Sequence, residues 1–181
     1  MKRRQRESIV AALDQKLSDQ GSWCGETHLQ KGIYFLQEML GVPTDFEYIL
    51  YKYGPFSREL RDELGSMRSD GLIDVVPQPA PYGPSLIATS AAERQLLARW
   101  PRTLARYEAR LDFVAKKLGG MGVGALERLA TALWVVRELP DASDPQRAAR
   151  IHELKPHVSH DLALNALSRV AKMETSAKRL R

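Results

Sequence analysis

The stretch YKYGPFSREL, residues 51–60, constrains the fold of this chain more than any other segment. The residues leading into it, 45–53, are rich in aromatic and β-branched types and have no helical period, which predicts a strand. Gly54-Pro55 predicts a turn. Ser57 is a favourable helix N-cap, because its hydroxyl can accept a hydrogen bond from a free amide of the first turn. The chain is therefore expected to pass from a strand into a helix at this corner.

Apolar residues on both sides of this corner recur three or four positions apart, which is the spacing of one helix face. Two short runs, LIDVV and LIAT, predict strands over residues 72–76 and 86–89, joined by a proline-rich loop. Pro101 is expected to kink or restart a helix. The motif SDPQ resembles a capping box with proline in the first turn. The predicted helices cover about residues 5–19, 28–40, 58–70, 90–100, 101–118, 125–139, 145–154 and 160–177.

The order helix, helix, strand, helix and β-hairpin is that of a winged helix with one added strand. We therefore predict a mainly α protein of the α+β class. Residues 1–89 would form a winged helix-turn-helix with an extra strand, and residues 90–181 a helical extension packed on it. The helix over 101–118 has an apolar stripe that could pack internally or against a second subunit, so a homodimer is one expectation. This stripe consists of Leu104, Tyr107, Leu111, Val114 and Leu118.

The net charge of +5 is distributed unevenly. Residues 1–18 hold five basic and two acidic groups, residues 19–88 five and ten, and residues 89–181 seventeen and ten. The predicted winged helix is thus acidic, and its β-hairpin carries no Lys or Arg, although phosphate contacts supply most non-specific DNA affinity. Basic groups that could contact nucleic acid lie mainly outside it. These candidate contacts are Lys2, Arg3, Arg4, Arg6, Arg99, Arg102, Arg106 and Arg110.

Several classes of protein are disfavoured by composition. Cys24 is the only cysteine, so it can form neither an internal disulfide nor a cysteine-rich zinc site, which fits a reducing cytoplasm. The apolar run IVAAL is too short for a signal peptide or a membrane span. We expect a cytoplasmic protein that does not contact a membrane.

Patterns that could support catalysis or metal binding are weak. Three histidines lie in HELKPHVSHD, but Pro156 interrupts them, and a polar helix entry explains them better. Cys24 and His28 could form a nucleophile and base, yet a lone cysteine near a tryptophan favours packing. Glu47 and Lys52 are five apart on the predicted strand and would point to opposite faces, unlike the acid-x-lysine pattern of metal nucleases. GGMGVG is not a phosphate loop, because no strand precedes it and no lysine follows. We therefore predict no catalytic residues, metal or cofactor.

Two parts of the chain carry a family resemblance. LQKGIYFLQEML and YGPFSRELRDELGSMRSDGLI resemble the bacterial YwgA-like family, whose members carry an LQK-type helix, a YGPFS turn and a helix ending in GLI. LERLATALWVV and ELKPHVS are also similar. The layout more distantly resembles Panacea-domain antitoxins of the SocA type and the C-terminal toxin-binding domain of DarG-type antitoxins. Those relatives imply a non-enzymatic protein that binds and neutralises a toxin.

Two functions follow from the corner at residues 51–61. The leading hypothesis is a protein-interaction module of a toxin–antitoxin or phage-defence system, which occludes a partner's active or nucleic-acid-binding face. Its acidic groups would complement a basic partner, and tyrosines are favoured at interfaces. The alternative is a DNA-binding transcriptional regulator that reads duplex DNA through the helix after Ser57. The predicted partner-binding residues are Tyr51, Tyr53, Phe56, Arg58, Glu59, Arg61, Asp62, Glu63 and Tyr82.

Overall fold

A computed structural model describes residues 1–80 and 83–180. Within these residues the fold is mainly helical, with eight α-helices, one π-helical segment and two two-stranded antiparallel sheets, which confirms the predicted mainly α, α+β class. No described helix combines the length and the apolar character needed to span a membrane. The elements are α1 (Arg3–Asp19), α2 (Glu26–Glu38), β1 (Ile49–Tyr51), β2 (Gly54–Phe56), α3 (Arg58–Ser69), β3 (Ile73–Val76), β4 (Ser85–Ala88), α4 (Ser90–Ala92), η1 (Glu93–Leu97), α5 (Pro101–Leu118), α6 (Val123–Glu138), α7 (Asp144–Leu154) and α8 (His160–Ala177).

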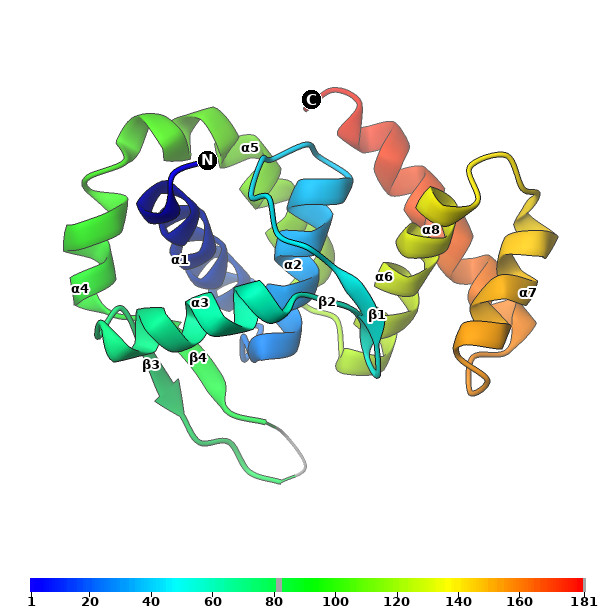
Figure 1. Cartoon of the computed structure of the whole chain (residues 1–181), viewed down its shortest axis with the longest axis horizontal. Helices are drawn as coiled ribbons and strands as arrows, with labels where there is room; N and C mark the ends of the chain where they lie inside the picture. The colour runs from blue at the N-terminus through cyan, green and yellow to red at the C-terminus, as the bar shows by residue number, and fades with distance from the viewer. Residues whose placement is uncertain (81–82, 181) are drawn as a thin grey trace.

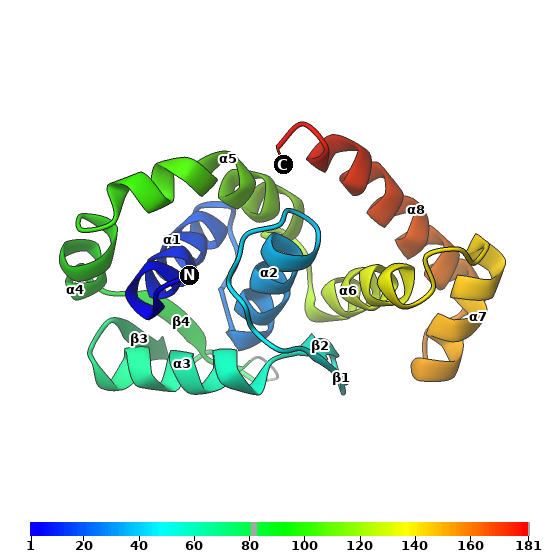
Figure 2. The ribbon, with the colours of Figure 1, turned by 45° about the horizontal axis from the view of Figure 1, so that its top comes forward.

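The helices form one elongated molecule with a shared core. Figure 1 places α1, α2 and α3 towards one end, α7 and α8 at the other, and α6 between them. In the view of Figure 2, α5 arches over α1 and α2. Buried side chains from both predicted segments, 1–89 and 90–181, belong to one hydrophobic cluster. The helical extension packs on the N-terminal part through α5 and α6.

The apolar stripe of α5 is used inside the chain. Tyr107, Leu111 and Val114 are buried, and α5 packs against α1 and α2. Close packing of α1 on α2 depends on Gly32, where a Cβ would lie only 2.7 Å from Cδ2 of Leu13. Of the two arrangements expected for this stripe, internal packing is the one the fold adopts.

The strand predicted over residues 45–53 is mostly irregular backbone. Only Ile49–Tyr51 forms β1. Asp45 is left-handed, with a φ of 58°. The side-chain amide of Gln37 donates to the carbonyl oxygen of Phe46 at 3.0 Å, and its oxygen accepts from the Phe46 N–H at 2.9 Å. Because a side chain on α2 takes these backbone groups, they are not available to a sheet.

The predicted turn at Gly54-Pro55 is also misplaced. Tyr51 pairs with Gly54 and Leu50 with Pro55, so Gly54 and Pro55 belong to β2 and the chain reverses at residues 52–53. Gly54 has a φ of 86°, a left-handed conformation that glycine adopts without steric cost. Proline is tolerated in this strand because the hairpin has only two strands and needs no further ladder partner.

The start of α3 agrees with the prediction. Oγ of Ser57 accepts a hydrogen bond from the Leu60 N–H at 3.2 Å, as an N-cap does. The buried side chain of Gln30, on α2, also clamps Ser57: its amide donates to the Ser57 carbonyl and its oxygen accepts from the Ser57 N–H, both at 2.9 Å. α2 itself begins earlier than predicted, with Gly25 rather than Thr27 at its N-cap position.

Most of the remaining elements follow the sequence pattern, but the helix predicted over residues 90–100 is the short α4 followed by the π-helical η1. β3 and β4 pair from Ile73↔Ala88 to Val76↔Ser85. Pro101 starts α5 at a helix N-terminus, where its missing N–H leaves no bond unmade. The predicted capping box at residues 143–146 begins α7, and Ser159 caps α8. α7 and α8 pack on α6, which completes the end of the molecule opposite α1.

Candidate functional site

The β1–β2 hairpin exposes large apolar side chains. Ile49, Tyr51 and Tyr53 are 43%, 60% and 48% exposed. Phe56 is half-buried, and its ring lies 5.7 Å from that of Tyr51 and 5.4 Å from the guanidinium of Arg61. Sequence reasoning missed Ile49, because the exposed face of β1 could not be chosen without its neighbours. Tyr82, also predicted to bind a partner, lies outside the described residues.

Two buried lysines hold the backbone of this hairpin. Nζ of Lys31, on α2, donates to the carbonyl oxygen of Pro55 at 2.9 Å. Nζ of Lys155, just after α7, donates to the carbonyl oxygen of Tyr51 at 2.7 Å and also to that of Lys52. The hairpin is therefore anchored by side chains from elements far apart in the sequence. Nothing in the sequence marked either lysine, because each needs the folded neighbourhood to find its acceptor.

Charge beneath the hairpin is only partly balanced. Lys31 is 2% exposed, and burial lowers its pKa to about 8, with Glu127 opposing the change and Lys155 adding to it. The buried carboxylate of Glu127 lies 3.2 Å from Nζ of Lys155 and 3.3 Å from Nε2 of His157. Burying these ammonium and carboxylate groups costs desolvation free energy. The hydrogen bonds from the two lysines to the hairpin backbone offset part of that cost and hold the hairpin in place.

The hairpin also touches α6 directly at Gly54. A Cβ at this position would lie 3.2 Å from Oγ1 of Thr131 and 3.4 Å from the carbonyl oxygen of Glu127. Glycine is therefore required both by the left-handed φ and by the close approach of the two backbones. The result is a short, firmly seated hairpin whose large side chains face outward.

α3 carries three distinct faces. At 3.6 residues per turn, Leu60, Leu64 and Met67 share one side and are buried. The arginines flank this apolar stripe on one side, and most of the acids flank it on the other. The arginine flank consists of Arg58, Arg61 and Arg68 with Gly65 among them, the acidic flank of Glu59, Glu63 and Asp70, and the fourth acid, Asp62, lies opposite the buried stripe. The helix is thus not uniformly acidic, a pattern that a helical projection of the sequence would have revealed.

Three of the four acids are engaged within the chain. Glu63 is buried and accepts from the guanidinium of Arg6, with both oxygens 3.0 Å from its Nε. Asp70 pairs with Arg4 at 3.5 Å. Glu59 accepts a hydrogen bond from the Glu47 N–H at 3.1 Å. Glu63, which was predicted to bind a partner, therefore lies inside the fold and cannot present a free carboxylate to a basic partner.

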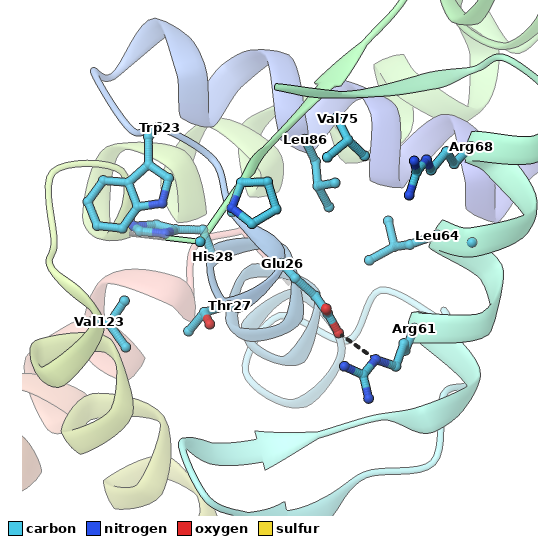
Figure 3. Close-up of a pocket in the computed structure, with 14 residues that line it drawn as sticks. Trp23, Glu26, Thr27, His28, Arg61, Leu64, Arg68, Val75, Leu86 and Val123 are labelled. Carbon is cyan, nitrogen blue, oxygen red and sulfur yellow. Dashed lines mark ion pairs between the residues drawn. The ribbon is translucent and has the colours of Figure 1, made fainter. Parts of the chain in front are cut away.

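Two arginines of this flank, Arg61 and Arg68, line a groove of about 440 Å³ between α3, the start of α2 and the β3–β4 hairpin (Figure 3). Leu64, Gly65 and Arg68 line it from α3, and Val75 and Leu86 from the two strands. Arg61 points into the groove and pairs with Glu26 at 3.3 Å. A second cavity of about 250 Å³ lies under the β1–β2 hairpin and shares Arg61 and Glu26 with the groove. Arg61 therefore joins the groove to the hairpin.

The N-terminal residues predicted as nucleic-acid contacts are mostly engaged in the fold. Arg3 and Arg4 both pair with the buried carboxylate of Glu7, at 2.9 and 2.8 Å. Arg6, besides its pair with Glu63, stacks its guanidinium 4.5 Å from the ring centre of Phe46. Lys2 is exposed. Arg3 and Arg4 are also exposed despite these pairs, so Arg6 is the one of the four that is half-buried.

The second predicted basic set lies along α5 and just before it. Arg99, Arg102 and Arg106 are exposed. Arg102 and Arg106 border a shallow cavity of about 380 Å³ that Gln5 also lines. Arg110 is half-buried and donates from Nε to the Leu180 carbonyl oxygen at 2.7 Å. These residues are not part of the groove or of the hairpin surface.

The residues weighed for catalysis have structural surroundings. Cys24 is buried beside Asp14, and burial raises the pKa of its thiol well above the ordinary range. Asp14 accepts from the Ala88 N–H at 2.7 Å, which ties α1 to β4. His28 is buried against Trp23, donates from Nε2 to the Met121 carbonyl at 2.8 Å, and has a pKa lowered by burial. No three metal-ligating side chains gather at a metal-binding distance anywhere in residues 1–80 and 83–180.

No protein-family model matches this chain, and no curated protein is similar enough to count as a relative.

Proposed function

We propose that this chain is a non-catalytic protein-interaction module that neutralises a partner protein by covering its active or nucleic-acid-binding face. The setting would be a bacterial toxin–antitoxin or phage-defence system, as the likeness to Panacea-domain and DarG-type antitoxins and to the YwgA-like family implies. In this proposal, residues 1–89 act as a winged helix with the β1–β2 hairpin as its added strands, and the hairpin and α3 form the contact surface.

The observation that carries the proposal is an exposed apolar hairpin on a fixed backbone. Tyr51 and Tyr53 are about half exposed, while the carbonyl oxygens beside them are held by Lys31 and Lys155. Aromatic side chains on a preorganised element are typical of interface centres, because little conformational entropy is lost on binding. Contact with a basic partner would use Glu59 and Asp62, since Glu63 is taken by Arg6.

The test is co-purification with the product of a neighbouring gene. Serine replacements of Tyr51 and Tyr53 together should release the partner or weaken its affinity by about tenfold or more, because each removes a large apolar contact. A matched control replaces Leu162 and Leu164 by serine, since these leucines on α8 are similarly exposed, at 44% and 40%, and lie away from the hairpin. If the hairpin variant retains the partner as well as the control does, the proposal is wrong.

A winged-helix DNA-binding regulator is the second candidate. The arginine flank of α3 favours it, because Arg58, Arg61 and Arg68 are exposed while most acids of the helix are turned to other groups. The described residues of the β3–β4 hairpin contain no Lys or Arg, which disfavours it. This function predicts that the protein shifts its own promoter DNA in a gel, with an affinity that falls steeply as salt rises. No shift at low salt would eliminate it.

A further inference from the structure

A glycine in the middle of α3 has no explanation within the fold. Gly65 is exposed, and a Cβ built there would have nothing within 4 Å. Its φ is not positive, so any residue could adopt its conformation. Glycine is the poorest helix former after proline, and its use here sacrifices helix stability without relieving a clash or a turn. A side chain at this position would project into the groove, so glycine serves to keep the groove open for something that approaches α3 closely.

The charge of the groove indicates what approaches. Arg61 and Arg68 stand on either side of Gly65, about two turns of helix apart, and both face the groove (Figure 3). Arg68 makes no ion pair with any residue the structure describes. Glu26 is the one carboxylate among the lining residues, and Arg61 already neutralises it at 3.3 Å. The groove therefore has an excess of positive charge, which suits a ligand with carboxylate or other anionic groups.

The shape and the apolar lining favour a peptide over a nucleic acid. Leu64, Val75 and Leu86 supply apolar walls to the groove that the arginines also line. Arg61 and Arg68 border a recess of about 440 Å³, and phosphate contacts with these two arginines alone would leave its apolar walls unfilled. A single peptide strand with alternating side chains can place apolar groups on these walls and carboxylates on the arginines.

We propose that this groove binds an extended segment of the partner protein that carries both carboxylates and apolar side chains. The inference rests on the proposed function, because the groove meets the β1–β2 hairpin at Arg61, which lines both cavities and contacts Phe56. The partner would contact the hairpin with its folded surface and lay the acidic segment along α3.

The test uses a phage-displayed library of random twelve-residue peptides, selected on the immobilised full-length protein. Selected peptides are then measured in solution by fluorescence anisotropy, with dodecathymidylate as the nucleic-acid probe. Two variants alter the groove: Gly65→Gln fills it, and Arg68→Glu reverses its charge. Two controls make the same chemical changes at exposed positions that do not line the groove: Ser69→Gln on α3 and Arg94→Glu on η1.

The expected result is enrichment of peptides that combine Asp or Glu with apolar residues. Arg68→Glu should weaken their binding by about tenfold or more through the loss of one charge-assisted contact, and Gly65→Gln should weaken it by a similar factor because its side chain occupies the groove, while the controls bind as the wild type does. Failure to enrich such peptides, or equal binding by the groove variants, overturns the inference. Tighter binding of dodecathymidylate that Arg68→Glu abolishes would assign the groove to nucleic acid instead.

This outcome is separable from that of the proposed function. If the Tyr51 and Tyr53 variant loses the partner but no acidic peptides are selected, only the groove inference fails. If that variant keeps the partner, the proposed function fails, whatever the peptides show on the purified protein.

Discussion

The buried amine of Lys31 should make the stability of the protein depend on pH. Lys31 is 2% exposed, and its ammonium donates a hydrogen bond to the Pro55 carbonyl oxygen. Burial lowers the pKa of Lys31 from 10.5 to about 8. Replacement by methionine keeps the length and apolar stem of the side chain but removes the charge and the donor. Lys31→Met therefore measures the desolvation free energy of the buried ammonium that holds the hairpin.

The pKa difference sets the expected magnitude. At about 1.4 kcal/mol per pH unit, the change from 10.5 to about 8 corresponds to about 3 kcal/mol. Below pH 8 the folded and unfolded states both hold the proton, and this whole cost is present. Between pH 8 and 10.5 the unfolded chain keeps a proton that the folded chain has released, so the stability of the wild type rises with pH. Lys31→Met lacks this rise and loses about 1 kcal/mol at all pH values for the missing hydrogen bond.

Urea unfolding at pH 7, 8 and 9 measures the effect. The free energy of unfolding of the wild type minus that of Lys31→Met should grow by about 1 kcal/mol from pH 7 to pH 9. Subtraction cancels the opposing effect of Cys24, whose raised thiol pKa lowers stability above pH 9 in both proteins. Lys52→Met, at an exposed lysine of the same hairpin, serves as the control and should parallel the wild type. Parallel curves for Lys31→Met and the wild type would refute the reasoning.

Three further substitutions probe the hairpin, the groove and the N-terminal ion pair. Gly54→Ala should lower stability by about 2 kcal/mol, because it combines a left-handed φ with contact on Thr131; a change below about 0.5 kcal/mol in urea unfolding would contradict this. Gly65→Ala should raise stability by about 0.5–1 kcal/mol, and a loss would mean that the groove is not open. Arg6→Ala should lower the free energy of unfolding by about 2–3 kcal/mol, because it leaves the buried carboxylate of Glu63 unpaired. Adding Glu63→Gln to this variant should restore part of the lost stability. If the losses from the two substitutions simply add, the two groups do not interact.

Local signals were sufficient for most of the helices. The N-cap at Ser57, the capping box before α7 and the restart of the helix at Pro101 all lie where their residues predict. Each depends on atoms within one turn of the chain, so the information is present in a short window of sequence. The strand over 45–53 was overestimated because the deciding contact comes from Gln37 on another element. The residues on either side of Phe46 in the sequence do not indicate that Gln37 will bind its backbone.

The candidate surface was predicted in part. Of the aromatic residues at the 51–56 corner, Tyr51 and Tyr53 are exposed and Phe56 is half-buried, and the exposed Ile49 was missed. The charges of residues 19–88 were judged by their sum, and that sum concealed the separation of arginines from acids around α3. The sum also treated Glu63 as a surface group, whereas the fold pairs it with Arg6.

The sequence by itself determined most of the helices, the caps of α3, α7 and α8, and the mainly α class, because periodicity and capping act over a few neighbouring residues. The tertiary structure alone decided which charges are free. Arg6 and Glu63 neutralise one another across 57 positions of sequence. The ammonium groups of Lys31 and Lys155 donate to backbone carbonyl oxygens of the hairpin. Those oxygens come within hydrogen-bonding distance only after α2, α6 and the hairpin have packed together. Electrostatic partners are chosen by distance in space, and that distance is settled by packing of the core.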